Sequence, residues 1–212
     1  MSTPFKICGL STPATVDAAI AAGAAHLGFV FFPPSPRHLD PAGAGALVGR
    51  VPPGIGRVAV LVDPDDALVA AVLGTGITIL QLHGAPPGRV AALKASTGLP
   101  VWSAHGVATR AEITHAREAA GPADLLLLDA KAPSSAPLPG GNGLSFDWRL
   151  LDGLRPDRPF GLAGGLDPAN VGEAVAAVRP ALVDVSSGVE DAPGVKSVMK
   201  INNFAAAVRA AR

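Results

Sequence analysis

The sequence alternates between short apolar runs and longer segments that carry helix start signals, and the alternation continues along the whole chain. The apolar runs, of four to seven residues, are too short for a buried helix and are typical of buried strands. Strands that alternate with helices predict βαβ units and a parallel sheet. The expected strands are residues 4–10, 26–32, 57–62, 77–82, 100–104, 124–129, 160–163 and 182–186.

The expected helices begin at polar caps, most of which stand beside a proline. Thr12, Asp40, Asp63 and Asp167 each precede a proline, a residue suited to the first helical position. Thr109 caps a further helix without one. The expected helices are residues 14–22, 41 to about 51, 65–73, 87–96, 110–120, 146–154, 168 to about 178, and 197–210.

Eight strand and helix pairs favour a closed barrel over an open sheet. Doubly wound sheets usually stop at about five or six strands, whereas eight βα units close into a (β/α)8 TIM barrel. We therefore expect an α/β protein with one barrel domain over residues 1–212. The long connection 130–144, rich in Ala, Pro, Ser and Gly, is typical of a functional lid or a mobile segment.

Charge and cysteine content narrow the class of partner and the compartment. Seventeen Lys and Arg balance 17 Asp and Glu, so no net charge attracts nucleic acid or an acidic membrane, and a small-molecule partner is favoured. One Cys cannot form a disulfide within the chain. With no apolar stretch near about 18 residues and no leader pattern, we expect a cytoplasmic protein.

The first strand carries an unusual polar face. Side chains alternate along a strand, so Lys6 and Cys8 share one side while Phe5 and Ile7 share the other. If the apolar pair packs under helices, Lys6 and the only cysteine point into the barrel, with Cys8 at the strand end where reactive groups gather. A lone cysteine is otherwise a small buried hydrophobe.

Further polar residues stand where other strands end, and together they resemble one family. The motifs are Lys6-Ile7-Cys8-Gly9, Ser35-Pro36-Arg37, Gln81-Leu82-His83-Gly84, Leu128-Asp129, Gly140-Gly141-Asn142-Gly143 with Phe146-Asp147-Trp148, Ala163-Gly164-Gly165-Leu166, and Asp184-Val185-Ser186-Ser187-Gly188-Val189-Glu190. Each piece is weak alone, but their order from the first strand to the eighth resembles the phosphoribosylanthranilate isomerases.

This resemblance implies an enzyme that carries out an Amadori rearrangement in tryptophan biosynthesis, with no cofactor and no metal. An N-linked aminoaldose phosphate becomes an aminoketose phosphate, which takes one acid to open the ring and one base to remove the proton from C2. The family's acid and base positions correspond to Asp129 and Cys8 here. Both would need shifted pKa values, because the ordinary values, about 3.9 for Asp and 8.5 for Cys, suit neither task.

The surroundings expected for these two groups would shift their pKa values in opposite directions. Burial at the end of a very apolar strand raises the pKa of Asp129. A nearby cation would lower the pKa of Cys8, and Lys6 is the nearest in sequence. Strand eight neighbours strand one in a closed barrel, so Asp184 could pair with Lys6. Alternatively, Lys6 is only a structural partner of interior carboxylates.

The resemblance also assigns the substrate contacts. Backbone N–H groups at Gly164, Gly165, Ser187 and Gly188 would bind the phosphate, because glycines allow close approach and helix starts favour anions. Gly141 and Gly143 would close over it. The planar fork of Arg37 fits the anthranilate carboxylate. Asp184 and His83 would contact sugar hydroxyls or the imine, although His83 is as readily explained as a hydrogen-bonded barrel histidine.

Some positions depart from the family pattern, and other functions stay open. Ala85, Ser197 and Asn142 stand where the family usually has an acidic residue, an aspartate, and a threonine or serine. Rival readings are a histidine-pathway aminoaldose isomerase, an indoleglycerol phosphate synthase, and a catalytically silent phosphate-binding barrel. The first normally has carboxylates at both catalytic strand ends, the second uses lysine and glutamate positions not found here, and the third predicts loss of an acid or base. Oligomeric state, monomer or homodimer, is not determined by the sequence.

Overall fold

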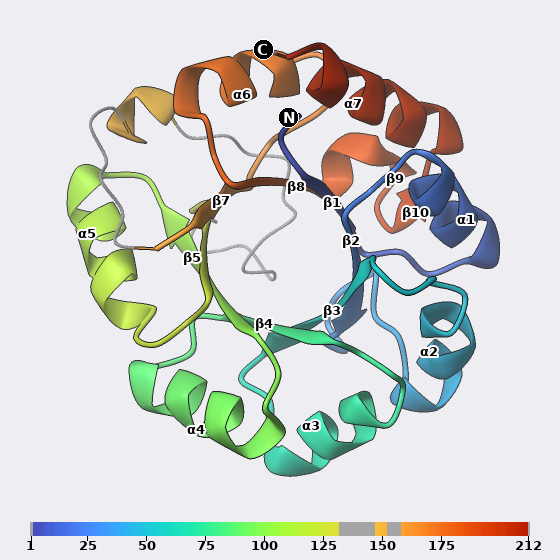
Figure 1. The fold of residues 1–212 in the computed structure, drawn as a ribbon, viewed down its shortest axis with the longest axis vertical. Helices are drawn as coiled ribbons and strands as arrows, with labels where there is room; N and C mark the ends of the chain where they lie inside the picture. The colour runs from blue at the N-terminus through green and yellow to red at the C-terminus, as the bar shows by residue number, and fades with distance from the viewer. Residues whose placement is uncertain (1, 132–146, 152–157, 212) are drawn as a thin grey trace.

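Eight parallel strands close into a barrel with helices around it, viewed down the barrel in Figure 1. This computed structural model describes residues 2–131, 147–151 and 158–211. Neighbouring strands follow sequence order, and β8 closes on β1, so the expected TIM barrel is confirmed. The strands are β1 (Phe5–Cys8), β2 (His26–Phe31), β3 (Gly56–Val62), β4 (Ile79–His83), β5 (Val101–Val107), β6 (Leu125–Ala130), β7 (Phe160–Leu162) and β8 (Leu182–Val185).

Seven α-helices surround the barrel in the described part of the chain. Where a helix over 146–154 was expected, the described residues form only a short 3-10 helix, η1 (Trp148–Leu151). A second short 3-10 helix and a hairpin, both unexpected, follow β8: η2 (Ser187–Val189), β9 (Glu190–Ala192) and β10 (Val195–Lys196). The helices are α1 (Pro13–Ala21), α2 (Pro41–Val48), α3 (Asp66–Leu73), α4 (Pro87–Thr97), α5 (Arg110–Ala119), α6 (Val171–Val178) and α7 (Val198–Ala210).

Three of the expected caps are confirmed, and two are wrong. The side chains of Thr12, Asp40 and Thr109 accept hydrogen bonds from the first turns of α1, α2 and α5. Asp63 does not cap α3: its φ of 44° turns the chain first, and Asp65 accepts the bond from the N–H of Leu68.

Asp167 also fails as a cap, because a turn separates it from α6. Its Oδ1 accepts hydrogen bonds from the N–H groups of Ala169 and Asn170, at 2.7 and 3.0 Å. The helix begins only after Asn170. Ser197 stands at the N-cap of α7, but its side chain makes no capping bond.

The apolar core has a layer between barrel and helices and a smaller one inside the barrel. Outward-facing strand residues such as Ile7 and Leu80 pack under the helices. Inside the barrel, a buried apolar cluster lies near the amino ends of the strands, and it consists of Val58, Ile79, Trp102, Leu125 and Leu182. None of the described helices combines the length and apolar character needed to cross a membrane.

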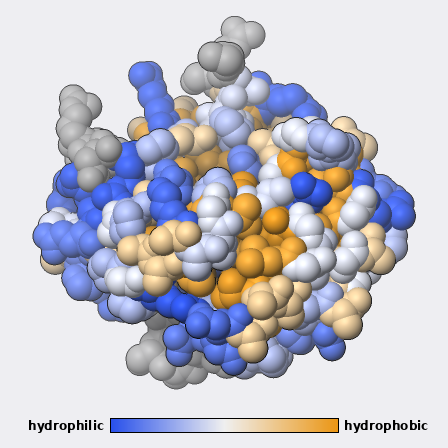
Figure 2. All heavy atoms as spheres, turned by 60° about the horizontal axis from the view of Figure 1, so that its bottom comes forward, coloured by the Kyte–Doolittle hydropathy of each residue, from blue (hydrophilic) through white to orange (hydrophobic). Residues whose placement is uncertain are grey.

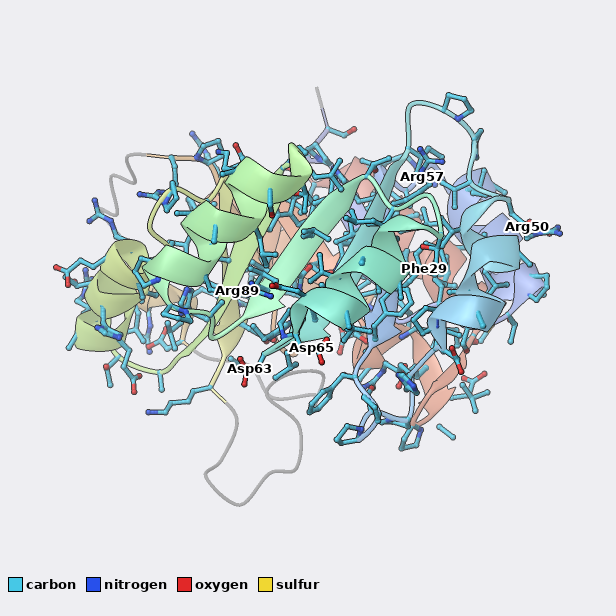
Figure 3. The ribbon with its side chains drawn as sticks, turned by 90° about the horizontal axis from the view of Figure 1, so that it is seen from below. Phe29, Arg50, Arg57, Asp63, Asp65 and Arg89 are labelled. Carbon is cyan, nitrogen blue, oxygen red and sulfur yellow. The ribbon has the colours of Figure 1, made fainter. Side chains whose placement is uncertain are left out.

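The two ends of the barrel differ in the residues that they carry. In the side view of Figure 3, Arg57 near the start of β3 lies at one end, and Asp63 and Asp65, which follow the strand, lie at the other. The outer surface of the side that carries α3 and α4 is mostly hydrophilic, with an apolar area in its middle (Figure 2). Only the end at which the strands finish carries the polar residues singled out from the sequence, and that end positions the site.

Candidate active site

A pocket opens at the carboxyl ends of the strands, with about 730 Å³ of empty space when the open solvent at its mouth is included. Its wall combines apolar side chains with a few polar groups that come from strands far apart in sequence. The residues that the sequence predicted for the site and that line this pocket are Cys8, Arg37, His83, Asp129, Gly164, Gly165, Asp184 and Ser187.

Lys6 lies fully buried directly behind the sulfur of Cys8. Its Nζ donates a hydrogen bond to Oδ2 of Asp184 at 2.8 Å, which confirms the pairing expected from the neighbouring strands. A side chain on Gly28 would collide with Lys6 and Cys8, so the missing side chain on β2 makes room for both. Burial favours the neutral amine, but the charge of Asp184 and its hydrogen bond act against burial, and the pKa of Lys6 is raised, so the amine stays charged.

The expected low pKa of Cys8 is not what the structure shows. Burial raises the pKa of the thiol, and the nearby Asp184 carboxylate raises it further. The positive charge of Lys6 lowers the pKa as expected, but Lys6 is paired with Asp184 and cannot offset the loss of solvent. The sequence placed the cation correctly and missed how deeply the thiol is buried. In the free protein Cys8 is therefore a thiol near neutral pH.

Asp129 closes β6 on the same pocket and has the shifted pKa that the sequence predicted. Burial, together with the charge of Asp184, raises its pKa from 3.8 to about 7. The carboxyl group can therefore hold a proton near neutral pH and give it up to a bound ligand. Gly164, in the loop after β7, lets the chain pass close to Asp129, because a Cβ at this position would lie 2.8 Å from Oδ1 of Asp129.

His83 and Gln81 form a neutral pair on the inner face of β4. Burial and the charge of Lys6 lower the pKa of His83 to about 4, so its ring is uncharged at neutral pH. Its Nε2 lies 3.1 Å from Nε2 of Gln81. Within the described residues, Oε1 of Gln81 and Oδ1 of Asp184 are buried without a hydrogen-bond partner, although both residues line the pocket. Two acceptors are thus available to a ligand.

Arg37 reaches the pocket with its guanidinium held by Glu190, a carboxylate to which no role was assigned from the sequence. Its Nε and Nη2 donate to Oε1 and Oε2 of Glu190, at 2.7 and 2.8 Å. Gly9 lies beneath the side chain, because a Cβ there would lie 2.5 Å from Cδ of Arg37. A carboxylate in the pocket would therefore meet a guanidinium whose Nε and Nη2 already bind Glu190.

The glycines after β7 and β8 are placed as expected for close approach to a ligand, with one exception. Gly164 and Gly165 have φ values of 85° and 61° and line the pocket, as does Ser187. Gly188 lies behind the wall, where its missing side chain makes room for the carbonyl oxygen of Leu166. The helix start expected here is only the three-residue η2, and Gly141 and Gly143 lie outside the described residues.

Two functional candidates, Gln81 and Glu190, were visible in the motifs but received no role. Alternation along β4 places Gln81 on the same face as His83, and that signal was available from the sequence. Glu190 follows β8, the last strand of the barrel, and begins a hairpin that was not expected. Its contact with Arg37 spans 153 residues, so no local pattern could have indicated it.

Comparison with known proteins agrees with this geometry. The family model described as N-(5'-phosphoribosyl)anthranilate (PRA) isomerase matches residues 5–207. The chain belongs to the PRA isomerase family. It is 52% identical to the N-(5'-phosphoribosyl)anthranilate isomerase of Paracoccus denitrificans over 97% of each chain.

Solved structures of PRA isomerases share the fold. The crystal structure of phosphoribosyl anthranilate isomerase from Thermotoga maritima superposes with a TM-score of 0.85 at 33% identity over 98% of both chains. Another PRA isomerase structure, with a TM-score of 0.80 at 31% identity over 98% of both chains, contains reduced 1-(o-carboxyphenylamino)-1-deoxyribulose 5-phosphate. A relative of this chain therefore binds a carboxylated aromatic sugar phosphate.

Proposed function

We propose that this chain is an aldose–ketose isomerase of tryptophan biosynthesis that converts N-(5'-phosphoribosyl)anthranilate to 1-(o-carboxyphenylamino)-1-deoxyribulose 5-phosphate. Asp129 is the general acid and Cys8 the general base, and the described residues supply both without a cofactor. The reaction takes place in the cytoplasm on a small phosphosugar, with no nucleic acid or membrane involved. The observation that carries the proposal is the placement of Cys8 and a high-pKa Asp129 on the wall of one pocket.

The chemistry runs in two proton transfers. Asp129 donates its proton to the furanose oxygen as the bond between that oxygen and C1 breaks, which leaves an iminium between C1 and the anthranilate nitrogen. The Cys8 thiolate then removes the proton from C2, and the electron pair neutralises the iminium to give an enolamine. Return of a proton to C1 and loss of the C2 hydroxyl proton give the ketone and restore both groups.

The two groups must work from an uncommon protonation state. The pKa of Asp129 is about 7 and that of Cys8 is raised, so a thiol and a carboxylate dominate between these values. The active form, a carboxylic acid with a thiolate, carries the same net charge and is a minor tautomer of that state. The rate should therefore follow a bell-shaped pH profile, with its maximum between the two pKa values.

Substrate groups are assigned by charge and hydrogen-bonding need. Arg37 binds the anthranilate carboxylate with its planar guanidinium. Gly164, Gly165 and Ser187 supply backbone N–H groups for the phosphate. The sugar hydroxyls donate to the two buried acceptors, Oδ1 of Asp184 and Oε1 of Gln81, whose desolvation is otherwise uncompensated.

The test follows the fluorescence of N-(5'-phosphoribosyl)anthranilate as the protein is added. Wild type should consume the substrate, and Cys8→Ser and Asp129→Asn should each lose about 10²- to 10⁴-fold in kcat. A matched control is His26→Gln, which changes a histidine at the opposite end of the barrel. Turnover that survives in both Cys8→Ser and Asp129→Asn would refute the assigned roles, and a wild type that leaves the substrate unchanged would refute the function.

A further inference from the structure

The strongest unexplained feature of the site is a buried group of charges behind the pocket wall. We propose that Glu190 and Lys196 are positioning residues that fix the guanidinium of Arg37 for recognition of a carboxylate and hold the loop after β8 beside Cys8. The inference rests on the proposed function and adds two residues to it. Neither lines the pocket, so neither is proposed to touch the substrate.

Glu190 holds Arg37 through a two-point contact that determines how the arginine faces the pocket. The side chains of Arg37 and Glu190 are 6% and 4% exposed, so little water competes with the bond. The N–H of Gly194 also donates to Oε2 of Glu190, at 3.2 Å. A carboxylate held at both oxygens cannot rotate, and the planar fork of Arg37 is held in the same plane.

Lys196 binds the same carboxylate and the chain beside Cys8. Its Nζ donates to Oε1 of Glu190 at 2.6 Å, and to the carbonyl oxygen and Oγ of Ser186 at 2.9 and 3.3 Å. Ser186 in turn donates from Oγ to the carbonyl oxygen of Cys8 at 3.2 Å. The contacts thus run from Arg37 to the strand that carries the base.

The charges of this group favour an anionic ligand. Arg37 and Lys196 face the single negative charge of Glu190. Burial lowers the pKa of Lys196, and the charge of Glu190 and its hydrogen bond act against that shift. Burial would raise the pKa of Glu190, but the hydrogen bond from Arg37 and the charge of Lys196 lower it, so Glu190 remains ionised. Lys6 and Asp184 balance each other nearby. Among the described residues behind this wall, Arg37, Lys196 and Glu190 therefore sum to one positive charge, which favours a substrate with a carboxylate and a phosphate.

Comparing the affinities of two ligands, one with a carboxylate and one without, distinguishes lost positioning of Arg37 from a general loss of structure. In Glu190→Gln, Arg37 loses the contact that fixes its orientation, so affinity for the reduced product analogue, which carries the anthranilate carboxylate, should fall about 10- to 100-fold relative to affinity for ribose 5-phosphate, which has no carboxylate. The added positive charge acts on both anionic ligands and cancels from this ratio. The KM for substrate should rise by more than kcat falls. Equal losses for both ligands, or no loss for either, would overturn the inference.

Lys200→Met is the matched control, since in the described part of the chain Lys200 binds the main-chain oxygen of Glu190 and the exposed Asp191. It should leave both affinities unchanged, and a loss like that of Glu190→Gln would contradict the inference. If Glu190→Gln does not fold, Lys196→Met provides the test. Alkylation of Cys8 by iodoacetamide at fixed pH should slow about three- to tenfold, because a cation near the thiolate is lost.

Lys196→Arg should restore most of the alkylation rate, because it restores the charge. An alkylation rate equal to wild type in Lys196→Met would overturn the role of Lys196. These outcomes are separate from the proposed function, because wild-type turnover tests that function directly, whereas the binding and alkylation measurements need no turnover.

Discussion

Replacing Asp129 by asparagine should make the protein more stable while it removes activity. The carboxylate is buried, and its pKa rises from 3.8 in the ordinary state to about 7 in the fold. Above pH 7 the folded protein must hold this group ionised against its surroundings. Each pKa unit corresponds to about 1.36 kcal/mol, so the cost approaches about 4 kcal/mol. Asparagine carries no charge, so the variant does not bear this free-energy cost.

The free energy of unfolding should depend on pH, and the sign of this dependence can be tested by urea unfolding. Between about pH 4 and pH 7 the folded wild type binds more protons than the unfolded chain, so its stability falls as pH rises. Urea unfolding followed by tryptophan fluorescence should show Asp129→Asn more stable by about 3 to 4 kcal/mol at pH 8, and nearly equal to wild type near pH 4. A difference independent of pH, or a less stable variant at pH 8, would refute the reasoning.

Asp184→Asn is the matched control for this experiment. Asp184 is also buried, but it balances the fully buried Lys6, so its removal leaves an unpaired charge. The control should lose about 3 to 5 kcal/mol of stability at pH 8. Opposite signs for two buried aspartates in one pocket would identify pairing with a cation, rather than burial itself, as the deciding factor.

Three further predictions concern the same barrel. Lys6→Met should raise the pKa of Cys8 further, seen as a shift of the alkylation profile to higher pH; an unshifted profile would show that Lys6 is structural only. NMR titration should find His83 uncharged down to about pH 5, because its pKa is about 4, and a transition near 6.5 would contradict its burial. Gly188→Ala should cost about 1 to 3 kcal/mol in urea unfolding, since its Cβ would lie 1.9 Å from the carbonyl oxygen of Leu166, and wild-type stability would show that the loop yields freely.

The barrel could be predicted because strand and helix signals are local. Period-two alternation correctly placed Lys6 and Cys8 inside, and closure of the barrel brought Asp184 to Lys6. The cap of α3 was misplaced because Asp63 and Asp65 are both suitable two residues apart, and only the backbone turn at Asp63 decides between them. Local rules therefore gave the architecture, whereas competing caps needed coordinates.

Which residues form the site could be predicted from the sequence better than how their pKa values are shifted. Burial of Asp129 followed from a continuous apolar strand, so the direction of its pKa shift could be predicted. For Cys8, the direction of the pKa shift depends on two opposed effects: loss of solvent, which raises the pKa, and attraction to Lys6, which lowers it. Their balance depends on how deeply the thiol is buried. The contact between Arg37 and Glu190 joins residues 153 apart in sequence through an unexpected hairpin, and such contacts are not encoded in any local pattern.

A crystal structure with the reduced product analogue bound tests the central claim most directly. The account predicts that Sγ of Cys8 lies within about 4 Å of C2, close to the spacing of reacting atoms. It also predicts that the Asp129 carboxyl lies about 2.6 to 3.2 Å from the oxygen released by ring opening, on the other side of the sugar. An analogue that contacts only one of these groups, or that binds away from the pocket they share, would contradict it.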